Sequence, residues 1–167
     1  LELYAENPSN PVNPSTTGTN SVAIGNGAGA TATDSFAIGR LCDATNTGAV
    51  AVGYNTDATG LRSIALGNGA DAAASYSSAI GSHSGNAGSQ AVSGAGAMAL
   101  GGSYASGTDS FAAGIANNTS SYGATGANSI AMGQLSRATA ANSVAIGDGA
   151  TSTTANLIAL GGTTDTV

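Results

Sequence analysis

Basic residues are scarce in this chain. Only 3 of the 167 residues are Lys or Arg, against 9 Asp and Glu, and the net charge is −6. Proteins that bind nucleic acid neutralise its phosphates with clustered basic side chains, and anionic membrane surfaces attract such clusters as well. We therefore expect neither nucleic acid nor an anionic membrane as a partner.

Long apolar runs are absent too. No run approaches the roughly 20 residues that a membrane-spanning helix requires, and residues 1–20 show no signal-peptide pattern. We expect no direct membrane insertion within this fragment. Because the numbering begins at Leu1 without Met, we expect a fragment or a processed chain whose export or anchoring signals lie outside it.

Cysteine occurs once, so the chain cannot form an intrachain disulfide. Cys42 lies three residues after Gly39, in a connecting segment. A free thiol or an inter-subunit contact is open, but a small residue in a turn is the simpler interpretation. A single cysteine does not indicate a redox compartment.

Tryptophan is absent, aromatic residues make up 4% and charged residues 7% of the chain, whereas 26 residues are Gly. Such a composition is typical of a disordered linker. The bulky apolar residues, however, recur at the same two places of a repeated pattern, and a linker has no reason to keep that spacing. We therefore expect a folded repeat protein.

The repeated pattern is the sequence Asn-Ser-Val-Ala-Ile-Gly at residues 20–25. Four successive intervals between copies are 14 residues, intervals of 20, 13 and 19 follow, and the last two are again 14. A fixed period of this kind indicates a stacked repeat architecture, in which neighbouring units complete one another's core. The ten copies end at Gly25, Gly39, Gly53, Gly67, Gly81, Gly101, Gly114, Gly133, Gly147 and Gly161.

Within each copy, bulky and small residues alternate, which is the period of a β-strand. Small residues recur five and six positions after the closing Gly, as in Ala30-Thr31 and Ala44-Thr45, and predict a second strand. Each unit, here called a rung, is thus strand, turn, strand, turn. We predict an all-β parallel β-roll or solenoid of about 14-residue rungs, stacked at roughly 4.8 Å.

The alternation also predicts a core. We assign the bulky residues to it and expect the small Ser and Ala face to admit another copy of the chain at close distance. A core with so few large side chains per rung is thin, so we expect oligomerisation to add burial. The assigned core residues are Val22, Ile24, Phe36, Ile38, Val50, Val52, Ile64, Leu66, Ile130, Met132, Val144 and Ile146.

The repeat defines the domain organisation. Residues 1–17, which contain three prolines, form a linker or the end of a preceding segment, residues 18–162 form the repeat domain, and residues 163–167 form a short tail. Insertions at 82–96 and 115–126 interrupt the spacing, and loops of this kind are where recognition concentrates. The candidate ligand contacts in or beside them are Tyr104, Tyr122, His83, Asn117 and Asn118.

Catalytic chemistry has little support. His83 is the only histidine, and nothing around it resembles a nucleophile elbow. Asp34, Asp43, Asp57, Asp71, Asp109 and Asp148 recur near Gly and Asn, which favours turn chemistry. Asp43, Asp57 and Asp71 each follow a closing Gly by four residues, so a stack would align them as a ladder of like charges unless a cation such as calcium relieves it. We assign no catalytic, cofactor or metal site.

The pattern at residues 20–25 and 142–147, with its variants about 14 residues apart, resembles the head repeat of the YadA-like trimeric autotransporter adhesins. The resemblance covers roughly residues 18–162, and similar repeats occur in bacteriophage fibre proteins. It implies a left-handed parallel β-roll in which three identical chains pack side by side. It also implies a head on the bacterial outer surface that attaches to a host-surface protein or glycan.

We therefore expect an adhesive or receptor-binding head of a trimeric, extracellular fibre, with a role in cell adhesion and virulence and no enzymatic activity. A passive spacer in a bacterial fibre, or in the virion fibre of a phage, is the first alternative. An ice-binding β-solenoid is a second, since Thr31, Thr45 and Thr59 predict a regular column of hydroxyl and methyl groups.

Overall fold

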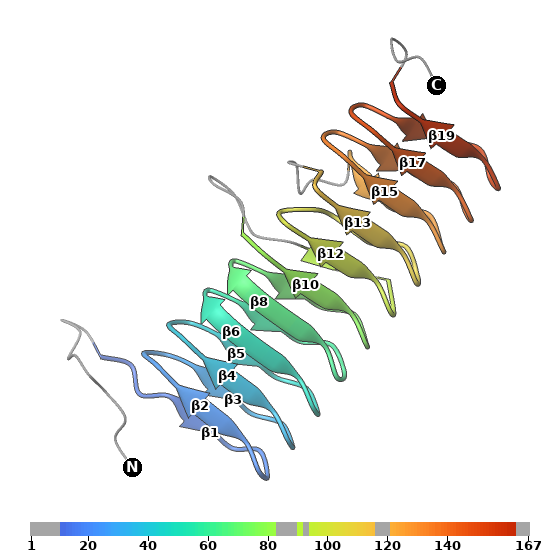
Figure 1. Ribbon diagram of the computed structural model, residues 1–167. Coiled ribbons are helices and arrows are strands. Elements are labelled where there is room, and N and C mark those ends of the chain that lie inside the picture. Colours follow the sequence, from blue (N-terminus) through green and yellow to red (C-terminus); the bar gives the residue numbers. More distant parts are fainter. Residues whose placement is uncertain (1–10, 83–89, 92–93, 116–120, 163–167) are drawn as a thin grey trace.

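The computed structural model describes residues 11–82, 90–91, 94–115 and 121–162. Every regular element in these ranges is a β-strand, and all strand pairs are parallel. The chain winds into an elongated solenoid, with its first and last strands at opposite ends (Figure 1). The all-β parallel solenoid with a spacing of about 14 residues is therefore confirmed.

One side of the solenoid is a 10-stranded sheet, the wide sheet. Each of its strands carries the middle of one repeat, and equivalent residues pair in register, as Val22 does with Phe36 and Phe36 with Val50. Its strands are β2 (Val22–Ile24), β4 (Phe36–Ile38), β6 (Val50–Tyr54), β8 (Ile64–Asn68), β10 (Ser78–Ile80), β12 (Met98–Leu100), β13 (Phe111–Ala113), β15 (Ile130–Met132), β17 (Val144–Ile146) and β19 (Ile158–Leu160).

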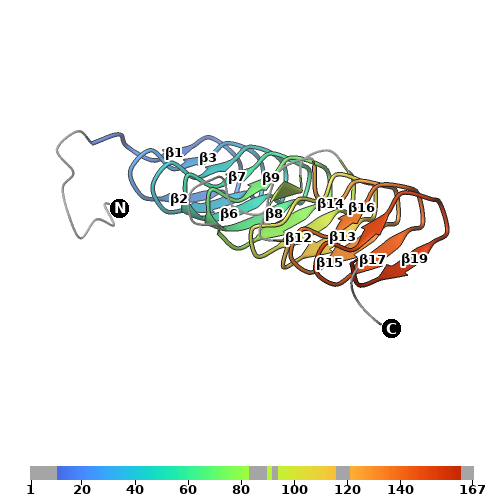
Figure 2. The ribbon, with the colours of Figure 1, turned by 90° about the horizontal axis from the view of Figure 1, so that it is seen from above.

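The opposite side is built from two-residue strands, which form the narrow side (Figure 2). They make a six-stranded and a three-stranded sheet, and isolated bridges of Tyr104 with Gln90 and of Ala105 with Ala124 lie between the two. These strands are β1 (Ser15–Thr16), β3 (Gly29–Ala30), β5 (Asp43–Ala44), β7 (Asp57–Ala58), β9 (Asp71–Ala72), β11 (Gln90–Ala91), β14 (Gly123–Ala124), β16 (Arg137–Ala138) and β18 (Thr151–Ser152).

The second strand of each rung begins one residue earlier than the sequence pattern predicts. Asp43 and Ala44 form β5, whereas the pattern placed the strand at Ala44-Thr45. The narrow side also starts early, because β1 lies within residues 1–17 and pairs with β3. The domain boundary at residue 18 stays a prediction.

The Asn-Ser pair of the motif makes a turn rather than extending the strand. In the turn Ala32–Ser35, both the backbone N and the hydroxyl of Ser35 donate to the carbonyl oxygen of Ala32, at 3.3 and 2.7 Å. Asp34, in the third turn position, has φ of 57°. Asn, Asp and Gly tolerate this left-handed conformation best, which explains the residue types before the motif serine.

The closing glycine of the motif is required by backbone packing. Gly25 has φ of 125°, and a Cβ on it would collide with the carbonyl oxygen of Gly39 in the next rung. The same collision recurs between Gly39 and Gly53. A side chain at these positions would separate successive rungs.

The core assignment from the sequence is wrong, because it chose the wrong face of the wide strands. The central alanine of the inner strands is fully buried, as in Ala37, Ala51 and Ala65, whereas the bulky residues on either side point outward and are only partly covered. In the end strands β2 and β19 the central alanine is partly covered. The residues misassigned to the interior are Val22, Ile24, Phe36, Ile38, Val50, Val52, Ile64, Leu66, Ile130, Met132, Val144 and Ile146.

The interior has room only for small side chains. Among the residues that the structure describes, the fully buried side chains apart from Ile115, Cys42 and Thr56 are Ala and Ser. A 14-residue rung folds back on itself too tightly to enclose two layers of branched side chains. A period of two shows that the faces differ, but not which of them points inward.

We predict that enlarging the interior alanine destabilises the solenoid. Ala51→Leu adds three carbon atoms in a space closed by Ala37 and Ala65 on the neighbouring strands, so the free energy of unfolding should fall by about 1–3 kcal/mol or more. Urea unfolding followed by circular dichroism measures this. Ala73→Leu is the matched control because Ala73 is exposed; equal effects of the two substitutions would contradict the assignment of the interior.

Cys42 belongs to this interior. It is fully buried just before β5, and its thiol donates to the carbonyl oxygen of Gly53 at 2.7 Å. Thr56 lies one rung further on, and its hydroxyl makes the same bond to Gly67 at 2.7 Å. Burial raises the pKa of the Cys42 thiol. An inter-subunit contact of this side chain is therefore excluded.

We predict that the thiol is unreactive in the folded protein. Because only the thiolate is a nucleophile, burial and the raised pKa should both slow labelling of Cys42 by a thiol-specific disulfide reagent. Absorbance should show labelling in 8 M urea and little in native buffer. Rapid labelling of the native protein, at a rate similar to that in urea, would contradict the buried placement.

Candidate interaction surfaces

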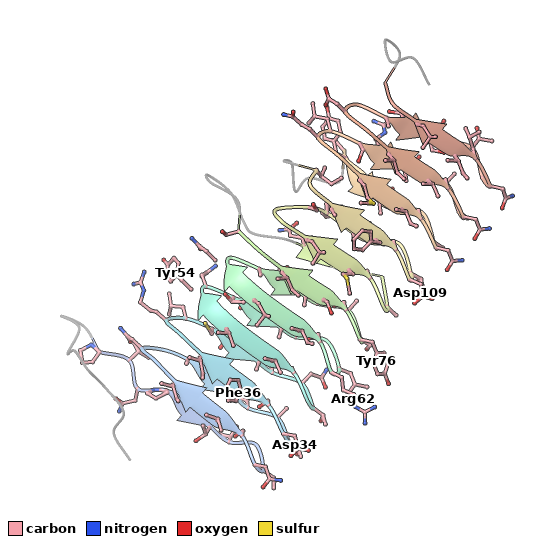
Figure 3. The ribbon with its side chains drawn as sticks, viewed as in Figure 1. Asp34, Phe36, Tyr54, Arg62, Tyr76 and Asp109 are labelled. Carbon is pink, nitrogen blue, oxygen red and sulfur yellow. The ribbon has the colours of Figure 1, made fainter. Side chains whose placement is uncertain are left out.

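The outward face of the wide sheet is almost entirely apolar. Each strand contributes its residues on either side of the buried alanine, and among these outward positions only Ser78 is polar. Ile64 is 38% and Ile146 40% exposed, and Phe36 lies on β4, next to the terminal strand of the sheet (Figure 3). Contiguous apolar patches larger than a few hundred Å² are rare on soluble monomers and mark interaction surfaces. This face, the apolar face, is the first candidate surface.

The narrow side carries the aspartate ladder that the sequence predicts. Asp43, Asp57 and Asp71 are the first residues of β5, β7 and β9 and pair with one another in register. Burial, and then the charge of the preceding aspartate, raise the pKa of Asp57 and of Asp71. The uncharged Gly29 and Gln90 stand at the two ends of the ladder. These three residues are therefore strand residues rather than turn residues.

The motif turns form a third surface, along one edge of the wide sheet. Their third-position residues have positive φ and stack from rung to rung, and we call them the corner ridge. Amide groups link parts of it: Asn20 donates to Asp34, and Asn128 to Asn142, at 3.1 Å. The corner ridge consists of Asn20, Asp34, Gly48, Arg62, Tyr76, Gly96, Asp109, Asn128, Asn142 and Asn156.

The comparison with protein families matches this repeat. The YadA head domain repeat (2 copies) matches residues 17–40, 44–70, 58–84 and 124–150, together more than half of the chain. The chain belongs to this family. No curated protein matches the chain. The resemblance to YadA-like heads, drawn from the motif, is thus confirmed.

The apolar face is consistent with what is general in this family. YadA-type heads belong to surface-exposed adhesins that are trimeric in general, and a rod with one uncovered apolar face is consistent with such an assembly. In the described parts of this YadA-type chain, no helix is long and apolar enough to cross a membrane. Nor do these parts hold a group of three or more His, Cys, Asp or Glu side chains that would bind a metal ion.

The predicted ligand contacts fall into two groups. His83, Asn117 and Asn118 lie outside the described residues. Tyr104 and Tyr122 both lie on the narrow side and are half-buried, Tyr104 bridging to Gln90 and Tyr122 packing against the alanine interior. The structure brings these two tyrosines to the same side of the solenoid, and their part in binding stays a prediction.

Two other aromatic residues were missed in the sequence. Tyr54 lies at the edge opposite the corner ridge (Figure 3). The guanidinium of Arg40 lies over its ring, 4.4 Å from the centre. On the corner ridge itself, Arg62 and Tyr76 occupy neighbouring turns. In both pairs the residues are 14 positions apart, so the repeat spacing, applied to non-motif positions, would have found them.

The threonine column is longer than the sequence pattern predicts. Thr31, Thr45 and Thr59 are exposed directly after β3, β5 and β7, and Thr17 holds the same place after β1. Ala73 interrupts the series after β9, and it resumes after β14, β16 and β18 with Thr125, Thr139 and Thr153. The ice-binding alternative stays a prediction.

We predict that the aspartate ladder makes the head more stable in acid. A carboxyl group whose pKa is raised in the folded state stabilises that state fully below its ordinary pKa of 3.8. The contribution falls as pH rises through the folded-state pKa, because both states are then ionised. The melting temperature should therefore decrease from about pH 4 towards neutral pH.

A matched pair of variants isolates this effect. Asp57→Asn with Asp71→Asn should flatten the pH dependence and raise the melting temperature at pH 7, as followed by circular dichroism. Asp148→Asn removes one exposed carboxylate away from the ladder and should leave the profile unchanged. A double variant with the wild-type profile would contradict the ladder as its source.

Proposed function

We propose that the chain is the homotrimeric head of an extracellular fibre and attaches it to a host or cell surface. The observation that carries this proposal is the apolar face, whose outward positions are all apolar except Ser78. Burying partly exposed side chains such as Ile64 and Ile146 between chains would add the hydrophobic free energy that an interior of Ala and Ser cannot supply. The bulky face, rather than the small one, is then the assembly surface.

The number of chains and the left-handed winding come from the family. Three solenoids that turn their wide sheets towards a common axis would bury the apolar face and leave the narrow side, the corner ridge and the Arg40–Tyr54 edge accessible. The charges support this orientation, because Asp43, Asp57 and Asp71 lie on the narrow side, opposite the apolar face.

Attachment would depend on avidity. Three identical copies of a weak site on one rigid head bind a multivalent surface more strongly than one copy does. A host-surface protein or glycan is the expected partner, and the insertions at 82–96 and 115–126 remain proposed contact loops. The spacer alternative predicts the same trimer without binding, so adherence of the purified head to cells separates the two.

We predict that a charge on the apolar face prevents assembly. The wild type should have a solution mass near three times 15.6 kDa by light scattering. Ile64→Asp with Ile146→Asp should lower it towards 15.6 kDa, because burying an unpaired carboxylate is strongly unfavourable. This differs from the expectation for a core residue, since the Asp side chains remain in water in the monomer.

The control places the same charge on the other side. Thr45→Asp with Thr59→Asp adds carboxylates at exposed positions after β5 and β7 and should leave the trimer intact. A monomeric wild type would contradict the proposed assembly, and so would a trimer that tolerates aspartate on the apolar face.

A further inference from the structure

Two residues on the corner ridge differ in type from the other eight. All ten positions have positive φ, and eight are Asn, Asp or Gly, the residues that adopt this conformation most easily. The exceptions are Arg62 and Tyr76, with φ of 52° and 62°, and they occupy successive rungs. A long cation and an aromatic ring therefore stand side by side where local folding favours neither.

The fold makes little use of these two side chains. Backbone bonds fix both turns, with Arg62 N donating to Thr47 O at 2.9 Å and Tyr76 N to Leu61 O at 2.7 Å, and asparagine would donate equally well. Tyr76 is 55% exposed. Within the described residues, neither side chain makes a hydrogen bond or an ion pair. Arg and Tyr are unfavoured at positive φ, and the described part of the fold gains no hydrogen bond or ion pair from these side chains. A residue kept in such a conformation indicates a functional reason for its side chain.

The rungs on either side of Arg62 and Tyr76 carry glycine at the ridge position. Gly48 precedes Arg62, and the stem of Arg62 lies over it, since an added Cβ would be 3.1 Å from Arg62 Cγ. Gly96 follows Tyr76, and the carboxylate of Asp109 covers the position where a Gly96 side chain would start. Along this edge the order is thus cation, aromatic ring, a residue without a side chain, and carboxylate (Figure 3).

We propose that Arg62, Tyr76 and Asp109 form a binding site for a neutral glycan chain lying along the corner ridge. The C–H face of a sugar ring carries weak positive charge and packs on the negative face of an aromatic ring. The guanidinium donates hydrogen bonds to sugar hydroxyls and the carboxylate accepts them, and such charge-assisted bonds are the strong ones. At a spacing of roughly 4.8 Å per rung, the site has the length of two or three sugar units.

Charge favours a neutral ligand. The charges of Arg62 and Asp109 cancel within the site, and the chain as a whole has a net charge of −6, so an anionic sialic acid or sulfate group would gain no net attraction. This inference rests on the proposed function and supplies its ligand class, and it places the contact on the motif turns rather than in the insertions. Three ridges in one trimer would engage a branched glycan together.

Asparagine substitutions test the site without disturbing the turn. Labelled trimer is applied to a printed panel of galactose-, mannose- and N-acetylglucosamine-terminated oligosaccharides and their sialylated forms. We expect the wild type to bind neutral members, Tyr76→Asn to lose about tenfold or more in apparent affinity, and Arg62→Asn to lose less. Tyr54→Asn removes an exposed tyrosine from the opposite edge and should bind as the wild type does.

Thermal unfolding of the same variants supplies a second readout. Because asparagine suits positive φ, Tyr76→Asn should melt at the same temperature as the wild type or higher, as should the control Leu135→Asn, which has φ of 54° at the opposite edge. A lower melting temperature for Tyr76→Asn alone would show that the tyrosine serves the fold, and would overturn the inference.

The binding outcomes separate this inference from the proposed function. A trimer that adheres to cells but binds no glycan, prefers sialylated forms, or keeps its neutral-glycan binding in Tyr76→Asn overturns the site and leaves the adhesive head standing. A trimer that binds neither cells nor glycans overturns both proposals.

Discussion

The whole architecture depends on how closely the two sides of each rung approach. Parallel pairing stacks equivalent residues at a strand spacing of roughly 4.8 Å, and the short rung leaves an interior that only Ala, Ser and a few slightly larger side chains fill. The motif glycine allows the backbones of successive rungs to lie in contact, and the hydroxyl of the turn serine closes the turn by a hydrogen bond. Both keep the rung short. A core of this kind contributes little hydrophobic free energy per residue.

The bulky half of the motif therefore has another use. Its side chains cannot enter the interior, so they form a continuous apolar face that a single chain leaves uncovered. A thin core and a large apolar face support the proposed association of several chains, and the family to which the chain belongs is trimeric in general. The narrow interior would then explain both why the core is thin and why the chain would assemble through its bulky side chains.

Stacking also repeats exposed residue types along the solenoid. One residue type repeated at 14-residue intervals becomes a ladder, whether of amides along the corner ridge or of carboxylates on the narrow side. Amides relieve the close spacing by hydrogen bonding, whereas carboxylates respond to it with raised pKa values. Arg62 and Tyr76 interrupt these regular columns, and the proposed glycan site would give the interruption a function.

The sequence alone determined the rung, its period, the parallel stacking and the family, because each of these is a spacing along the chain. It also placed Asp43, Asp57 and Asp71 in a ladder. It did not decide which face of Val22-Ala23-Ile24 points inward, since alternation is symmetric and only the distance between the two sides of the closed rung excludes the bulky residues. The 14-residue spacing puts Arg62 with Tyr76, and Arg40 with Tyr54, on successive rungs, but only the turn conformations decide that each pair shares an exposed edge and that the Arg40 guanidinium lies over the Tyr54 ring.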